Sequence, residues 1–371
     1  MISQDVNRLL VAILIISVAI GMTFASVSMS VSAQSVNDDN PSVDITASPS
    51  DPDLDEEVNF SADVSKDVKA DRIGVGTGSE MQFYDENLTE AGDKSSVNVV
   101  AQNKYVNSSG KEYIIVGGTA SGTNVVAKVD PSDQSIVSQY TSMSFSPSDM
   151  DVYDGMAYVT AGGTDDIHVV NLSNMSEDRV ITAVASGKSL EVVDNGSYVI
   201  STDGAGTVQK VDLSDGTVAS STYSSASSDV IDIEEIPSEY ESNQVLVGWT
   251  GSVGNPRMAK VDYSDMSGNK LGSDKGAADS FSVINSTHVV YGAANNGKLK
   301  VANYSDMTHA YQGAPSGAGG EAEVDVIDSD TAVLGTSDGG VYKVDINHSD
   351  GSLNFSANVS GLGTIKTVKY Y

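Results

Sequence analysis

The chain has 371 residues, with 51 acidic and 20 basic side chains and a formal net charge of −31. This charge disfavours a nucleic-acid partner, because the phosphates would repel it. Cysteine is absent, which excludes disulfides, thiolate nucleophiles and cysteine-based metal sites. The acids are spread along the whole chain, and in 1 M salt their repulsion is screened beyond about 3 Å. We therefore predict adaptation to high salt; an ordinary acidic secreted protein is the alternative.

The N-terminal segment has the features of an export signal. Residues 9–20 are apolar apart from one serine, Arg8 precedes them, and small residues suited to signal peptidase end the segment at 31–33. We predict a cleaved signal peptide over residues 1–33. The uncharged span 9–33 is also long enough for an uncleaved membrane anchor. Both interpretations place residues 34–371 outside the cytoplasm.

Residues 34–58 are predicted to be a polar, acidic linker. Within it, Asp51–Glu57 has acids at alternate positions, as a calcium loop does, but lacks the glycine that such a loop uses for its sharp turn. A solvated linker is the favoured interpretation. The stretch 48–65 resembles the opening strands of a PKD-type immunoglobulin-like domain, over fewer than twenty residues.

One pattern is repeated seven times along the rest of the chain. Apolar runs that end in a small residue recur at intervals of 40 to 47 residues, at Gly76, Gly117, Ala161, Ser201, Gly248, Gly292 and Gly335. About ten residues later a second run ends in Asp or Asn, as in AKVD (127–130), QKVD (209–212) and YKVD (342–345). Such a period, built from short strands, is typical of a β-propeller blade. We predict an all-β, seven-bladed propeller over residues 59–371.

Each repeat predicts a four-stranded antiparallel blade. An inner strand alternates apolar and polar residues, as in LEVVD (190–194), and a tight turn such as Asn195-Gly196 follows. The second strand is nearly all apolar, the third carries the KVD phrase, and the outer strand is more polar. Helical periodicity is missing after residue 25.

These repeats resemble a known type. Residues 146–178 are similar to YVTN/LVIVD repeats of exported archaeal and bacterial propellers, through an Asp-x-Val before a turn, a Tyr-Val in the second strand and a Val-Val-Asn-Leu-Ser in the third. The resemblance implies the fold and leaves the activity open, because such propellers include enzymes, scaffolds and adhesins. KVDLSDGTV (210–218) also resembles PQQ-type repeats, but without their aromatic and glycine-rich signature, so we expect no quinone cofactor. The acidic composition resembles that of halophilic archaea and their viruses.

Two segments compete to close the ring. NFSADVS (59–65) and NFSANVS (354–360) differ at one residue, and each is followed by a possible inner strand, at 67–71 or 365–371. We predict that the C-terminal strand 365–371 is the inner strand of the first blade, which removes open sheet edges. The spare N-terminal strand is then expected at the rim or paired outside the ring.

Four acidic residues occupy similar positions on the predicted inner strands, and we expect them near the ring axis: Asp151, Glu191, Asp232 and Asp325. Carboxylates there suit Ca²⁺ or Mg²⁺, which take oxygen ligands, or a carboxylate pair for glycoside hydrolysis. Structural hydrogen bonds to nearby amides are the favoured interpretation. Beyond a possible Ca²⁺, no cofactor is expected.

Other candidates are weaker. Trp249, the only tryptophan, is predicted to pack in the core between blades, with a partner contact as the alternative. His168, His288, His309 and His348 lie in separate repeats without ligand spacing and are predicted to be unrelated. The repeated Asp-x-Ser-Asp phrases (Asp212/Asp215, Asp262/Asp265) are predicted to be capped turns before metal sites.

Asn-x-Ser/Thr sequons are more than twice as frequent as chance predicts. Eleven occur, which makes these asparagines glycosylation candidates: Asn59, Asn87, Asn107, Asn171, Asn174, Asn195, Asn285, Asn303, Asn347, Asn354 and Asn358. Part of the excess reflects the preference of Asn and Ser for turns.

No nucleophile elbow, phosphate-binding glycine loop or basic patch is present. We therefore predict an exported cell-surface or envelope module that binds a protein or glycan through one propeller face, with a virion spike as one variant. The membrane would be touched only through an uncleaved N-terminal segment. The alternatives are a carbohydrate-active hydrolase or lyase using axial carboxylates, and an architectural envelope component.

Overall fold

The computed structural model describes residues 42–48, 59–65, 72–91, 94–161, 166–182, 188–202, 206–224, 230–249, 258–271, 278–293, 297–306 and 308–371. The chain divides into two compact units, Met1–Lys69 and Ala70–Tyr371. The predicted signal or anchor segment (1–33) and the acidic segment Asp51–Glu57 lie outside the described residues. Across the described ranges, no helix has the length and apolar character needed to span a membrane.

The N-terminal unit contains a two-stranded antiparallel sheet. Strand β1 (Ser42–Ser48) pairs with β2 (Asn59–Ser65), in a register that joins Ser42 to Ser65 and Ser48 to Asn59. β2 is the spare NFSADVS segment, and its partner is β1 instead of a strand of the ring. The sequence predicts this segment either at the rim of the ring or paired with a strand that is not part of the ring, and the pairing with β1 corresponds to the second alternative.

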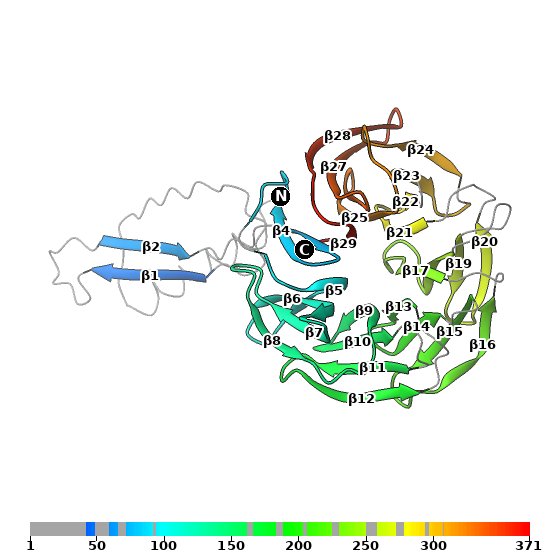
Figure 1. The fold of residues 1–371 in the computed structure, drawn as a ribbon, viewed down its shortest axis with the longest axis horizontal. Helices are drawn as coiled ribbons and strands as arrows, with labels where there is room; N and C mark the ends of the chain where they lie inside the picture. Colours follow the sequence, from blue (N-terminus) through cyan, green and yellow to red (C-terminus); the bar gives the residue numbers. More distant parts are fainter. Residues whose placement is uncertain are drawn as a thin grey trace, which may run out of the picture. The chain divides into compact units, whose positions relative to one another are not determined.

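The second unit is a ring of seven antiparallel sheets, seen down its axis in Figure 1. The inner strands are β5 (Asn98–Val106), β9 (Pro147–Tyr153), β13 (Leu190–Val193), β17 (Val230–Glu235), β21 (Ala278–Val283), β25 (Ala322–Asp328) and β29 (Ile365–Tyr370). The second strands are β3 (Arg72–Thr77), β6 (Glu112–Ala120), β10 (Met156–Ala161), β14 (Tyr198–Thr202), β18 (Gln244–Trp249), β22 (His288–Ala293) and β26 (Thr331–Thr336). The third strands are β4 (Met81–Asp85), β7 (Thr123–Val129), β11 (Asp166–Asn171), β15 (Thr207–Asp212), β19 (Met258–Asp262), β23 (Lys298–Asn303) and β27 (Gly340–Asn347). The outer strands are β8 (Ile136–Tyr140), β12 (Ser176–Thr182), β16 (Val218–Ser224), β20 (Ser267–Leu271), β24 (His309–Gly313) and β28 (Ser352–Val359).

The C-terminal strand closes the ring. β29 pairs antiparallel with β3, so that Val368 lies opposite Val75, and the first blade has the order β29-β3-β4. The predicted seven-bladed all-β fold is thereby confirmed, with the C-terminal strand in its predicted place. Six blades have four strands. The first has three, and isolated bridges from Glu90 and Ser95 to β4 cover its outer side.

The core lies between the blades. β18, β22 and β26 each bury five consecutive residues, because neighbouring blades cover both faces of these strands. A strand covered on both faces has no solvent side, which explains their continuous apolar sequence. The buried side chains are mainly Val, Ile, Leu and Ala, which pack well on a pleated surface.

The small residue near the end of a second strand leaves room for the inner strand of the next blade. A Cβ atom added at Gly292 would lie 1.8 Å from the carbonyl oxygen of Ala322, on the inner strand of the next blade. At Gly335 it would lie 2.7 Å from side-chain atoms of Ile365 and Val368 on β29. The repeated small residue therefore sets how closely consecutive blades pack.

The KVD phrase joins neighbouring turns. In the fifth blade, the Asp262 carboxylate accepts hydrogen bonds from the backbone N–H of Ser264 (2.8 Å) and from its hydroxyl (2.6 Å). Between these residues, Tyr263 is buried and its backbone N–H donates to the carbonyl of Asn243 in the preceding turn (2.9 Å). The Lys210 ammonium of the fourth blade lies 5.8 Å from the centre of the Tyr263 ring, so the phrase also links two blades.

Substituting Gly292 tests the close approach of the blades. Gly292→Ala should lower the free energy of unfolding by about 1–3 kcal/mol, because the new methyl group overlaps the Ala322 carbonyl and forces the blades apart. Urea unfolding followed by circular dichroism measures the loss. Gly78→Ala is the matched control, since its Cβ would meet no atom within 4 Å. Equal midpoints for the two variants would contradict the packing argument.

Candidate functional site

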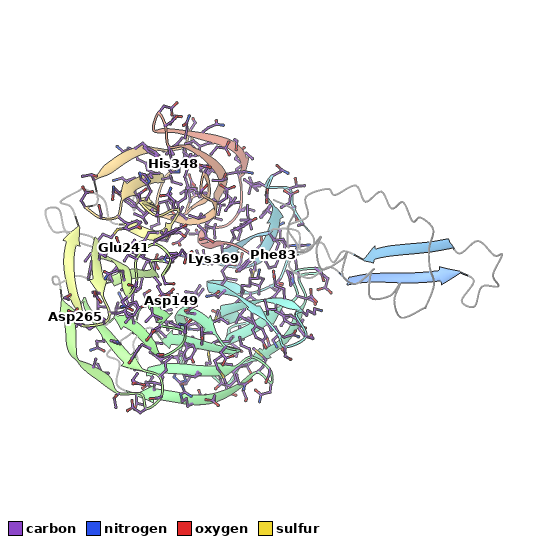
Figure 2. All side chains as sticks on the ribbon, turned by 180° about the vertical axis from the view of Figure 1, so that it is seen from behind. Phe83, Asp149, Glu241, Asp265, His348 and Lys369 are labelled. Carbon is purple, nitrogen blue, oxygen red and sulfur yellow. The ribbon has the colours of Figure 1, made fainter. Side chains whose placement is uncertain are left out.

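A polar cavity lies at the ring axis. It has a volume of about 290 Å³ and is lined by residues from the inner strands or their adjoining segments in all seven blades. Its charged lining residues are Asp149, Asp151, Lys188, Glu191, Asp232, Glu234, Glu323, Asp325, Lys366 and Lys369. Figure 2 shows Asp149 and Lys369 at the inner rim of the ring, whereas Asp265 lies at its outer edge. The fold thus gathers side chains that are far apart in the sequence into one charged centre.

Lys369 is the cation at this centre on which the surrounding charges act most strongly. Its ammonium lies 3.9 Å from the Asp325 carboxylate, and 37% of its side-chain surface is exposed, along the wall of the cavity. Asp325 above all, together with Glu234, Glu191 and Asp232, raises the pKa of Lys369 well above its ordinary range. The ammonium therefore stays charged and is a built-in counter-ion for these carboxylates.

Most of the axial aspartates hold the next blade. Each of the four accepts a hydrogen bond from a backbone N–H on the inner strand of the following blade. Asp149 accepts from Leu190 (2.9 Å) and Asp151 from Val192 (2.9 Å). In the same way, Asp232 accepts from Phe281 (2.9 Å) and Asp325 from Tyr370 (2.7 Å). These bonds satisfy amides on an otherwise unpaired strand edge.

Five of the axial carboxylates have raised pKa values, because burial disfavours their charged form. Burial raises the pKa of Asp151 to about 6 and that of Glu234 to about 7. Burial also raises the pKa of Asp149, and it raises the pKa of Glu191 and of Asp232 well above the ordinary range, with neighbouring carboxylates adding to the latter two shifts. A carboxyl group with such a pKa exchanges a proton near neutrality, as a general acid does.

The structure brings the four predicted axial acids together. Asp151, Glu191, Asp232 and Asp325 all line the one cavity, and their chemical role stays a prediction. Sequence reasoning missed Asp149 and Glu234, which lie two residues from Asp151 and Asp232 on the same strands and therefore share their face. It also missed the cation Lys369, because that residue belongs to the strand that closes the ring.

Trp249 lies in the core. Only 1% of its surface is exposed, and it packs with Val208 of the preceding blade and Val247 of its own. Its indole N–H donates to the carbonyl of Gly206 (3.3 Å). Trp249 therefore packs in the core between two blades, and its buried indole offers no surface to a partner.

Two of the histidines are neighbours, which the sequence did not indicate. The rings of His288 and His348 are 5.2 Å apart, at the boundary between the sixth and seventh blades. His348 bonds the hydroxyl of Tyr311 (2.5 Å) through Nδ1 and the carbonyl of Ser329 (2.8 Å) through Nε2. His168 is separate and bonds Glu177 (2.7 Å). The His309 side chain lies outside the described residues.

Metal binding has no geometric support in the described part of the chain. Within those ranges, no group of three or more histidine, aspartate or glutamate side chains is arranged to hold a metal ion. Calcium binding stays a prediction.

The Asp-x-Ser-Asp segments (Asp212/Asp215 and Asp262/Asp265) form hydrogen-bonded turns, in which each Asp accepts a hydrogen bond from the residue two positions later. Those bonds lower the pKa of Asp212 and of Asp265, with Ser214 and Ser267 as the main donors.

The sequons are concentrated in turns. Of the eleven candidates, Asn59 belongs to β2, and Asn354 and Asn358 belong to β28. The remaining eight end a strand or lie in the turn after it: Asn87, Asn107, Asn171, Asn174, Asn195, Asn285, Asn303 and Asn347. None of these eight asparagines is buried. Their modification stays a prediction.

Comparison with known proteins supports the fold alone. No family model matches the chain, and no curated protein matches its sequence. Among solved structures, U3-55K is similar with a TM-score of 0.61 and 12% identity, over 74% of this chain and 85% of that one. The WD40 repeats of RRP9 give 0.61 and 11%, over 74% and 84%. Kluyvelomyces marxianus Hsv2 gives 0.55 and 10%, over 77% and 94%. This chain is therefore similar in fold to WD40-type propellers.

Removing the Asp325 carboxylate tests its role in closing the ring. Asp325→Ala should lower the free energy of unfolding by about 2–3 kcal/mol, because the N–H of Tyr370 loses a charged acceptor and Lys369 loses its nearest carboxylate. Asp325→Asn keeps an acceptor oxygen and should lose less. Chemical denaturation in molar salt gives both values. An alanine variant as stable as the parent would show that the bond is dispensable.

The axial carboxylates also predict the direction of the pH dependence. Their pKa values are raised by folding, so the folded state binds more protons, and stability should fall as the pH rises from about 4 through about 7. The exposed turn aspartates have lowered pKa values, so their contribution is present above about pH 4 and is lost below it. Stability should therefore be greatest in mildly acidic solution.

Neutral variants separate the two groups of carboxylates. Glu234→Gln should flatten the decline between about pH 4 and 7, since a glutamine has no charge to bury. Asp212→Asn, in an exposed turn, should change only the acidic limb. The measurement is the free energy of unfolding at each pH, at constant ionic strength. A Glu234→Gln curve parallel to that of the parent would rule out the axial origin of the slope.

Proposed function

We propose that this protein is a non-enzymatic recognition module of a cell surface or envelope, which binds a protein or a glycan through one face of the propeller. The observation that carries this proposal is how the charged side chains at the ring axis are bound within the fold. The four axial aspartates bind backbone amides of the next blade, and the ammonium of Lys369 lies beside the carboxylate of Asp325. These aspartates are therefore engaged by the fold itself.

The size and lining of the axial cavity agree with this proposal. Pockets for small molecules are usually about 300–1,000 Å³ and mostly apolar. This cavity is about 290 Å³ and is lined by ten charged side chains. A rigid ring with broad end faces is better suited to a large partner. Similarity to WD40-type propellers is consistent with an interaction module in general.

The surface location rests on sequence features. The apolar segment 9–20, the small residues at 31–33 and the eleven sequons favour export. The net charge of −31 favours a medium of high salt. The partner is then expected on a halophilic cell, or on the envelope that carries the protein.

Cell binding tests the proposal. Labelled protein should bind intact cells of a halophilic host in molar KCl or NaCl, saturably and in competition with unlabelled protein. No binding at micromolar concentration would contradict the recognition function. Association of the protein with itself, rising with concentration in the same salt, would favour an architectural envelope component instead.

One observation favours a second candidate, a carbohydrate-active hydrolase or lyase. Glu234, with a pKa of about 7, lines the same cavity as the carboxylates that such chemistry needs. The double variant Asp232→Asn, Asp325→Asn separates the two functions, because asparagine retains an acceptor for the amides of Phe281 and Tyr370. Cell binding should persist in this variant, whereas glycan hydrolysis by an axial site should be lost.

A further inference from the structure

The antiparallel blades give the ring two different faces. Asp149 bonds Leu190 and Asp151 bonds Val192, so neighbouring inner strands run in the same direction. Within a blade, the turn from inner to second strand and the turn from third to outer strand lie at the same end. We call the face made by these turns the turn face. The other connections, from second to third strand and from one blade to the next, make the loop face.

The sequons are distributed unequally between these faces. Seven of the eight sequons that lie in turns belong to turns of the turn face, and Asn87 directly follows the turn-face end of β4, the third strand of the first blade. The two others of the ring, Asn354 and Asn358, lie in the outer strand β28. By sequence, no sequon lies between a second strand and the third strand of the same blade, or between an outer strand and the next inner strand. The asymmetry follows the topology of the fold.

Six of the eight sequons have the same local geometry. The side-chain oxygen of the asparagine accepts hydrogen bonds from the backbone N–H and the hydroxyl two residues later. At Asn171 the distances to Ser173 are 2.9 and 2.6 Å, and at Asn303 those to Ser305 are 2.9 and 2.8 Å. The same pair of bonds occurs at Asn107, Asn174, Asn285 and Asn347.

This geometry engages the oxygen and leaves the amide nitrogen available. Toward the other residues that the structure describes, none of these six Nδ2 atoms donates a hydrogen bond. Asn354 differs, because its Nδ2 donates to Asp345 (3.2 Å). None of the six asparagines is buried, and an Nδ2 beside a hydroxyl that is already oriented toward the amide is the atom that a glycosyl donor must reach.

The turn does not need asparagine for its own stability. Asp212 and Asp262 occupy the position of Asn171 and Asn303 in other blades and accept the same two bonds, at 2.8 and 2.6 Å. An aspartate there also adds to the charge that is spread over the rest of the chain. Asparagine at these positions is therefore explained by its amide nitrogen better than by the turn.

We infer that the turn face is N-glycosylated, at the six asparagines with this geometry. The donor is an activated glycosyl phosphate, handled by a separate transferase. A bond forms between Nδ2 and the anomeric carbon, the bond from that carbon to the phosphate oxygen breaks, and the phosphate leaves with the electron pair. Nδ2 loses one proton to a base of the transferase. The inference rests on the proposed extracellular location, and it leaves the loop face free for the partner.

Matched variants of the full chain, exported by a halophilic host, test this inference by peptide mass spectrometry. Asn303→Asp should remove one glycan mass while keeping the turn. Asp262→Asn creates the sequon Asn-Tyr-Ser in an equivalent turn, and it should add one glycan mass at residue 262. Ser305→Ala should remove the modification of Asn303 as well, through loss of the hydroxyl.

The outcomes separate this inference from the proposed function. Exported protein that carries no sugar on the turn face, or carries it only at Asn354 and Asn358, would overturn the inference and leave the recognition function standing. Glycosylated protein that fails to bind cells would do the reverse. Protein retained inside the cell without modification would contradict both.

Discussion

Every blade ends, on the side of the axis, in a strand edge whose backbone amides have no neighbouring strand to pair with. At three of the seven junctions, aspartates of the preceding blade accept hydrogen bonds from these amides, as Asp149 does from Leu190 and Asp325 from Tyr370. A short side chain can reach the next strand only if the blades are close, and the glycines at the ends of the second strands allow that approach. The axial aspartates, the small residues at the ends of the second strands and the spacing of the repeat thus all follow from the need to satisfy these backbone amides.

The ring could be predicted because its signals are local and repeated. Small residues, KVD phrases and turns recur with one period, and the duplicated NFSA segments identified two candidate closing strands. The contacts across blades were harder to predict. The pairing of His288 with His348, and of Lys369 with Asp325, depends on how strands of different repeats are placed around the axis. Trp249, whose position at a strand end also suited a partner contact, packs in the core between blades.

The acidic residues form two populations with opposite properties. At the axis, burial makes charge unfavourable and raises the pKa of Asp151 to about 6 and that of Glu234 to about 7. In the turns, hydrogen bonds from Ser and Thr stabilise the ionised form, as at Asp212 and Asp265. The large net charge of the chain therefore resides mainly on exposed groups, where dissolved ions screen it. The net charge of −31 does not by itself show this division between buried and exposed acids.

The position of β29 has a consequence for the order in which the molecule is made. The first blade contains β3 and β4, which precede all other strands of the ring in the chain, and β29, which follows all of them. Two strands alone are marginal in water, so this blade remains incomplete while the others assemble from local hairpins. Val75 meets Val368 only after the last strand of the ring has been synthesised, in a long-range step that is slow compared with hairpin formation. The earliest blade to be synthesised is thus the last to become folded.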